Sequence, residues 1–463
     1  MPSTRTIPPL LVTIVLMCAV GAPVGGSVRA QDNAAFQKDF RACKSPPSEK
    51  EVGMLKADLR KYEVEARAIQ TNLKVKREKD KIAAAAKLNL RTNQSNTLRT
   101  MERLECANLL KLPDPVNRAS ATVPTFLEAP VSFATDRVKD ASQASKPTKD
   151  PYTYFTGKLD PNFTEFSFGT VTVTIPTNRR PGELTLPPFW KVIGRNNPAE
   201  YFQLLGIQDM DREALLRDLA DARANPDSSI LLFVHGFNVT FSEGALRAAQ
   251  LAHDLSFPGR VFLYSWPSVG NIQAYWTDED SARISTPRFG RLLADLSRTG
   301  IKRIYIVAHS MGTRLVIPSV NNLRTSGGDL TKVSALLLAA ADFNQIEFKD
   351  IAGSFAQMRQ TGANVTIYAA SNDFALKISK VIHSYRRLGE SDPLLDIYAG
   401  LDSIDASTAA PMRRAFGHAY VSDSAQVVGD MQDVILKRLN PAQRGLEPIP
   451  NTSDYGWRIP RLR

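Results

Sequence analysis

The chain has 463 residues, more than one compact core usually organises, so we expect more than one structural region. Hydrophobic residues make up 43% and charged residues 23%, which excludes a disordered or collagen-like chain. The formal net charge is +11. A basic balance suits nucleic acid, anionic lipid or solubility in general; because no nucleic-acid-binding motif accompanies it, we expect no nucleic-acid partner.

The first 30 residues have the pattern of an export signal. Arg5 gives a positive start, and an apolar run, LLVTIVLMCAV, follows from Leu10 to Val20. Val28 and Ala30 supply the small residues of a cleavage site. The run is short for a transmembrane helix, so an uncleaved anchor is the alternative. We predict a signal peptide over residues 1–30 and a periplasmic or secreted mature protein.

Residues 31–111 are predicted to form a helical hairpin or a coiled coil. Ser48 and Glu51 have the spacing of a capping box. Apolar residues then follow a 4-3-4-3-4 spacing typical of a heptad seam: Leu55, Leu59, Tyr62, Ala66, Ile69 and Leu73. A basic cluster, KVKREKDK, interrupts the seam at Lys74–Lys81.

Two arrangements satisfy this helical pattern. One is a single long helix that pairs with a partner, either an envelope protein or a second copy of the chain. The other is a hairpin that turns near the basic cluster, which brings Cys43 and Cys106 to the same end. A disulfide between these cysteines would suit an oxidising compartment, and two free buried thiols are the alternative.

The composition changes twice after the helical region. Residues 112–150 are rich in Pro, Ser, Thr and Lys with little periodicity, and we predict a linker there. We assign residues 151–440 to a second domain and residues 441–463 to a C-terminal tail.

Apolar runs and amphipathic helical patterns alternate within residues 151–440. The expected strands are 166–176, 229–237, 260–268, 303–312, 333–342 and 364–373. The expected helices are 244–255, 288–300, 313–324, 346–362 and 425–439. Continuous apolar strands between amphipathic helices predict an α/β fold, with a mostly parallel sheet covered by helices on both faces.

One of these strands, RIYIVAHSMG, ends abruptly at a serine. Ser310 has small residues two positions before and after it, Ala308 and Gly312. A serine at a sharp strand-to-helix turn with this spacing is typical of a nucleophile elbow, although Ala308 replaces the usual first glycine. A plain turn residue is the alternative.

A nucleophilic serine needs a base and an acid, which follow it along the chain in the order acid, then base. His418, in a polar loop before the last helix, is the favoured base, and His383 is the alternative. Asp373 ends the strand 364–373 and is the favoured acid. Asp342, one strand earlier, is the alternative acid, or it caps a helix or braces the loop.

An acyl-transfer intermediate also needs two hydrogen-bond donors for its oxyanion. The backbone N–H of Met311 is one candidate, and that of Phe237, in the VHGFN stretch, is the other. Gly236 would allow close backbone approach and His235 could orient this loop. A plain tight turn at His235-Gly236 is the alternative.

Several blocks in order resemble a large bacterial family of α/β-hydrolase domains of unknown function, whose members are often described as esterase- or lipase-like. The blocks are LLFVHGFNVTFSEGALRAAQLAHDL, FLYSWPSVGNIQAY, IVAHSMGTRLV, VTIYAASNDFALKIS and GHAYV, and the likeness extends over about residues 129–439. It implies an α/β-hydrolase fold without a metal or organic cofactor. It also implies Ser310, Asp373 and His418 as the catalytic residues. It supplies no substrate.

These observations predict an exported serine hydrolase that cleaves a carboxylic ester or related acyl bond of a small molecule or lipid through an acyl-enzyme. The segment NIQAYWTDEDSARISTPR, residues 271–288, could cover the site. The alternative is a cell-envelope interaction or scaffold protein whose hydrolase fold is non-catalytic and whose N-terminal helices bind a partner.

Overall fold

The computed structural model describes residues 48, 50–51, 53–55, 57–58, 61–62, 64–65, 96, 125–146, 148–186, 197–221, 227–409, 418, 420–452 and 454–461. The predicted signal peptide, Cys43, Cys106 and most of the predicted helical region lie outside them. Ser48 and Glu51 do form the predicted capping box: Glu51 N donates to Ser48 Oγ at 3.3 Å, and Ser48 N donates to Glu51 Oε2 at 2.7 Å. Within the described residues, no helix is long and apolar enough to cross a membrane.

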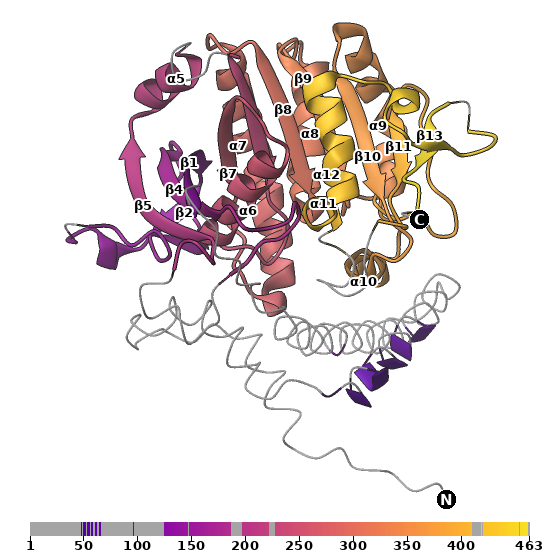
Figure 1. The fold of residues 1–463 in the computed structure, drawn as a ribbon, viewed down its shortest axis with the longest axis horizontal. Coiled ribbons are helices and arrows are strands. Elements are labelled where there is room, and N and C mark those ends of the chain that lie inside the picture. The colour runs from indigo at the N-terminus through magenta and orange to yellow at the C-terminus, as the bar shows by residue number, and fades with distance from the viewer. Residues whose placement is uncertain are drawn as a thin grey trace, which may run out of the picture.

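An eleven-stranded sheet forms the centre of the molecule, in the order β12-β13-β11-β10-β9-β8-β6-β7-β1-β4-β5 (Figure 1). Its strands are β1 (Phe126–Thr135), β4 (Ser167–Pro176), β5 (Gln203–Met210), β6 (Ser229–Val234), β7 (Arg260–Ser265), β8 (Arg303–His309), β9 (Val333–Ala339), β10 (Asn364–Ala369), β11 (Asp402–Asp405), β12 (Glu447–Pro448) and β13 (Gly456–Arg458). The pairs from β13 to β1 are parallel, and the pairs β12-β13, β1-β4 and β4-β5 are antiparallel. A separate ribbon pairs β2 (Arg137–Lys139) with β3 (Phe155–Leu159).

Helices cover both faces of this sheet (Figure 1). They are α5 (Arg212–Ala220), α6 (Phe241–Asp254), α7 (Tyr275–Ser297), α8 (Thr313–Thr325), α9 (Gln345–Ala356), α10 (Phe374–His383), α11 (Tyr420–Asp423) and α12 (Ala425–Gln432). Buried side chains of α7, α8 and α9 pack in one cluster, and those of α6 and α12 pack in another. Alternate residues of β6 enter opposite clusters: Leu232 joins the first and Phe233 the second. Both faces are therefore apolar, which explains the unbroken apolar runs in the sequence.

The segment 271–288, considered above as a cover for the site, belongs mostly to α7. This helix continues through Pro287, and its first turn carries Tyr275 and Asp278, both buried. Polar residues of this helix such as Asp278 make buried contacts, which are described below.

The sheet also extends beyond both predicted domain boundaries. The predicted linker, residues 112–150, contains β1 and β2, and β1 pairs with β4 and β7. The predicted tail, residues 441–463, contributes β12 and β13. The hydrophobic pattern does not predict these strands. One half of β1 is on the surface and the other half is buried, and β12 and β13 are too short to show an alternation of apolar and polar residues.

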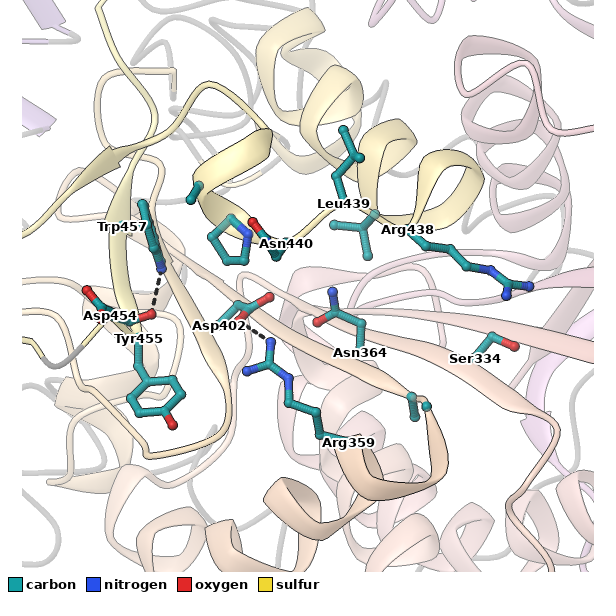
Figure 2. Close-up of a pocket in the computed structure, with 15 residues that line it drawn as sticks. Ser334, Arg359, Asn364, Asp402, Arg438, Leu439, Asn440, Asp454, Tyr455 and Trp457 are labelled. Carbon is teal, nitrogen blue, oxygen red and sulfur yellow. Dashed lines mark hydrogen bonds and ion pairs between the residues drawn. The ribbon is translucent and has the colours of Figure 1, made fainter.

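A buried charge cluster ties the last strands to the C-terminal segment. The Arg444 guanidinium lies 3.3 Å from a carboxylate oxygen of Asp402 and 3.3 Å from one of Asp430. Arg359 also pairs with Asp402, at 2.6 Å, beside a surface pocket (Figure 2). Tyr368 donates to Asp430 at 2.6 Å. Burial raises the pKa of Asp430, and the Arg444 charge opposes that rise.

We expect Arg444→Met to lower the free energy of unfolding by about 3–5 kcal/mol, because it leaves two buried carboxylates without their shared cation. Urea unfolding followed by circular dichroism measures this. Arg458→Met is the control, since its partly exposed pair with Asp405 should contribute less than about 1 kcal/mol. Equal effects of the two substitutions would contradict the role given to Arg444.

Candidate active site

Ser310 occupies a strained turn between β8 and α8. Its φ is +53°, in the left-handed region that non-glycine residues rarely adopt. Such a conformation costs about 1–3 kcal/mol and persists only where neighbours hold it. Here the Ser310 carbonyl accepts from Thr313 Oγ1 at 2.6 Å and from Asp342 N at 3.2 Å. This backbone geometry is that of a nucleophile elbow.

Two glycines allow the chain to pass close to this turn. A Cβ on Gly236 would lie 2.8 Å from the Cβ of Ser310. A Cβ on Gly312 would lie 2.4 Å from the carbonyl oxygen of His235. Both distances are shorter than non-bonded carbon and oxygen atoms tolerate. The loop after β6 and the elbow after β8 therefore meet backbone to backbone.

Asp373 and His418 form a hydrogen-bonded pair at the carboxyl end of the sheet. Asp373 caps α10, where its Oδ1 accepts from Leu376 N at 3.1 Å. Its Oδ2 accepts from His418 Nδ1 at 2.7 Å, and the carboxylate is fully buried. A proton on Nδ1 leaves Nε2 as the basic nitrogen of the ring. The structure thus brings the favoured acid and base together across 45 positions of sequence.

His309 holds the backbone at His418. Its Nε2 donates to the His418 carbonyl oxygen at 3.3 Å, and the two ring centroids are 4.9 Å apart. Burial lowers the pKa of His309 well below its ordinary range, so the ring is neutral. Because His309 immediately precedes Ser310, this contact connects the elbow directly to the segment that carries the candidate base.

The alternative acid, Asp342, has other partners. It pairs with Arg314 at 3.0 Å and Arg387 at 3.3 Å, and Tyr275 donates to it at 3.2 Å. Burial alone would raise the pKa of Asp342, but the two guanidinium groups hold it well below its ordinary value. Through its backbone N–H, Asp342 braces Ser310, which is the bracing role considered for it above.

The alternative base, His383, lies in the same polar cluster. Its Nε2 is 2.9 Å from Glu279 Oε1, and its Nδ1 is 2.9 Å from the carbonyl oxygen of Ser379. Neither contact is to Asp342 or Asp373. The two alternatives therefore do not make an acid–base pair with each other, whereas Asp373 and His418 do.

The candidate oxyanion donors flank the meeting point of the two loops. Met311 follows Ser310 in the turn, and Phe237 follows Gly236, whose backbone contacts Ser310. Among the residues that the structure describes, neither backbone N–H donates to another protein group. The Phe237 ring packs against Tyr275, with centroids 5.0 Å apart. Both amides are thus placed beside Ser310, and neither donates a hydrogen bond within the described chain.

His235 supports this loop as a neutral, buried ring. It stacks on Trp266 with centroids 5.1 Å apart, and Trp266 Nε1 donates to its carbonyl oxygen at 2.7 Å. Arg137 can only donate, so His235 Nε2 accepts from it at 3.3 Å, and Nδ1 carries the proton that goes to Gly236 O at 2.9 Å. Burial, reinforced by the Arg137 charge, lowers the pKa of His235 to about 3. Arg137 had no motif in the sequence to mark it.

The pocket in Figure 2, about 770 Å³ in volume, lies at the other end of the sheet. Ser334, Asn364 and Asp402 line it, at or next to the first residues of their strands. Ser310 and Asp373 instead follow the last residues of theirs. The pocket is therefore separate from the candidate site. Within the described residues, no group of three or more His, Cys, Asp or Glu side chains could hold a metal ion.

The buried His235 makes stability depend on pH. The unfolded chain gains a proton on this residue near its ordinary pKa of 6.5, but the folded chain gains it only near 3. Folding stability is therefore full above about pH 6.5 and falls as the pH drops, by up to about 1.4 kcal/mol per pH unit. In His235→Gln, we expect the urea-derived unfolding free energy to change about 1 kcal/mol less between pH 6.5 and 5.5 than in the wild type. Identical pH slopes would contradict this.

Part of the chain matches the model of a protein family. Residues 211–438 match the model described as alpha/beta hydrolase of unknown function (DUF900). The match runs from just before α5 to just beyond α12, and it includes Ser310, Asp373 and His418. A search of curated proteins and a search of solved structures each found no match. The large, mostly parallel sheet with helices on both faces agrees with this family's fold. Residues 211–438 are thus similar to the alpha/beta hydrolase family of unknown function, DUF900.

Proposed function

We propose that the protein is a serine hydrolase that cleaves a carboxylic ester or a related acyl bond. The observation that carries the proposal is the hydrogen-bonded pair of Asp373 and His418 at the same sheet edge as the strained Ser310. The match of residues 211–438 to a hydrolase family supports the general reaction class, and a serine with two adjacent backbone amides favours acyl transfer. We also propose that this activity lies in the periplasm or outside the cell, because residues 1–30 have the pattern of an export signal.

Ser310 performs the first half of the reaction. Its Oγ attacks the acyl carbon while His418 Nε2 takes the hydroxyl proton, and Asp373 stabilises the resulting imidazolium at Nδ1. The N–H groups of Met311 and Phe237 bind the oxyanion of the tetrahedral intermediate. The intermediate collapses when His418 returns the proton to the leaving alcohol, which departs and leaves an acyl-serine.

Water completes the second half by the same route. His418 Nε2 removes a proton from a water molecule, whose oxygen attacks the acyl carbon of the acyl-serine. A second tetrahedral intermediate forms against the same two amides. Its collapse breaks the bond to Ser310 Oγ, which regains its proton from His418, and releases the carboxylic acid.

Ser310→Ala is expected to remove p-nitrophenyl acetate turnover by at least about 1,000-fold and to abolish labelling by a fluorophosphonate probe. Ser326→Ala, at an exposed helix end, is the matched control and should keep both. Steady-state kinetics and in-gel fluorescence measure these effects. A folded wild-type protein that neither turns over esters nor reacts with the probe would instead favour a non-catalytic scaffold.

Substitutions at both acid–base candidates test the assignment further. We expect Asp373→Asn to lower kcat by about 10³- to 10⁴-fold, because the amide stabilises the wrong imidazole tautomer, and His418→Ala to lower it comparably. Asp342→Asn and His383→Gln should lower the unfolding free energy while keeping kcat of the folded protein within about tenfold. If Asp342→Asn removes kcat and Asp373→Asn does not, the acid has been misassigned.

A further inference from the structure

The loop that carries Phe237 is short and conformationally demanding. We call residues 236–239 the oxyanion loop. Asn238 within it has φ +59°, in the left-handed region. Val239 N donates to Ser268 Oγ at 3.1 Å, which joins the oxyanion loop to the loop that follows β7. One hydrogen bond between two loops does not fix a peptide group to the accuracy that an oxyanion hole needs.

The guanidinium of Arg137 also binds both loops, and all of its N–H groups donate hydrogen bonds. The residue is 3% exposed, and a guanidinium has five N–H donors in a rigid plane. Nε donates to Ser265 Oγ at 2.9 Å. Nη1 donates to the carbonyl oxygens of Ser268 at 2.7 Å and Thr156 at 3.3 Å. Nη2 donates to the carbonyl oxygen of Val239 at 2.9 Å and to His235 Nε2 at 3.3 Å. Every donor therefore has a partner, and two of these partners, Ser268 and Val239, belong to the two loops.

Asp278, on α7, complements Arg137 by accepting hydrogen bonds from the same two loops. Its Oδ2 accepts from Ser268 Oγ at 2.5 Å and from Asn238 N at 3.4 Å, and its Oδ1 accepts from Val269 N at 2.8 Å. The carboxylate is fully buried, and burial raises its pKa to about 6 despite these donors and the nearby Arg137 charge.

The charged groups of Arg137 and Asp278 form hydrogen bonds with backbone groups rather than an ion pair with each other. Arg137 holds carbonyl oxygens of Ser268 and Val239, and Asp278 holds N–H groups of Asn238 and Val269; Ser268 Oγ connects the two sets. Buried ionic groups seldom improve on apolar packing as a source of stability. Fixing both the donors and the acceptors of one loop is instead what a preorganised oxyanion hole requires.

We propose that Arg137, Ser268 and Asp278 form a clamp that positions the Phe237 N–H for the transition state. They are positioning residues: they act on the reaction through the oxyanion loop and do not touch the substrate. This inference rests on the proposed serine-hydrolase function, because the clamp matters only if an oxyanion forms beside Ser310.

A positioning role predicts a specific kinetic signature. A displaced oxyanion donor weakens the transition state more than the bound substrate, so kcat falls while KM changes little. Complete loss of one donor lowers kcat by about 10²- to 10³-fold. Partial displacement should cost less, and it should weaken a transition-state analogue that carries an oxyanion by the same factor.

The test compares Arg137→Lys and Asp278→Asn with the wild type, using p-nitrophenyl acetate turnover and inhibition by an aryl trifluoromethyl ketone. We expect kcat to fall about 10- to 100-fold with KM within about threefold, and the inhibition constant to rise in proportion to the loss of kcat/KM. Ser268→Ala, which deletes one oxygen, keeps the test decisive if Arg137→Lys does not fold.

Arg444→Lys is the matched control. Arg444 is buried like the clamp residues and pairs with Asp402 and Asp430, but it lies at the opposite end of the strands. It should lower the urea-derived stability while leaving kcat and the inhibition constant of the folded protein unchanged. The clamp variants must show the kinetic loss in protein whose circular dichroism is that of the wild type.

The outcomes separate the clamp from the proposed function. If the wild type turns over the ester and Ser310→Ala does not, but the clamp variants keep wild-type kcat, the clamp is refuted and the serine hydrolase stands. The clamp is also refuted if kcat falls with no matching change in the inhibition constant. If the wild type itself has no turnover, the proposed function fails and the clamp fails with it.

Discussion

The contact on which the rest of the site depends is the backbone approach of the oxyanion loop to the elbow. Gly236 lies against Ser310, and Gly312 lies against the carbonyl oxygen of His235, at separations that no side chain could occupy. This contact sets where Ser310 Oγ stands relative to the Phe237 amide. The strands β6 and β8 are hydrogen-bonded neighbours, so their carboxyl ends lie side by side. The chain must turn sharply after both strands for the two loops to stay in contact. The site geometry therefore requires glycine at positions 236 and 312, because a Cβ at either position would separate the two loops.

Such a contact is strained, and two buried polar clusters hold it from opposite sides. On the α8 side, Asp342 braces the Ser310 carbonyl through its own N–H while its carboxylate binds Arg314 and Arg387. On the β7 side, Arg137 and Asp278 fix the backbone of the oxyanion loop. Both clusters bury several charges within hydrogen-bonding distance of backbone groups. Buried ionic groups of this kind add little to the free energy of unfolding. We therefore infer that the two clusters serve mainly to fix the backbone near Ser310.

The sequence predicted those features of the fold and site that depend on residues close together along the chain. The apolar strands β6 to β10 read as continuous runs because helices cover both their faces, and the Ser310 turn, the alternative acids and the alternative bases follow from spacing and chain order. The choice between Asp373 and Asp342 was harder, since it depends on partners such as Arg314 and His418 that are remote in sequence. Arg137 was missed altogether because its contact with Ser265 joins residues 128 positions apart. The half-exposed β1 and the very short β12 and β13 were missed because they have no clean period.

The pairing of β1 and the position of Arg137 show that the sheet domain begins before residue 151. The family match begins at residue 211, and composition alone placed the domain start at 151. Yet β1 pairs in parallel with β7 from Val131 to Thr135, and Arg137 follows two residues later to bind both loops at the site. A chain that began at either boundary would leave one edge of β7 without its neighbour and the oxyanion loop without its guanidinium. The segment before residue 151 is therefore part of the same domain as the sheet, because it supplies both β1 and the guanidinium that binds Val239 and Ser268.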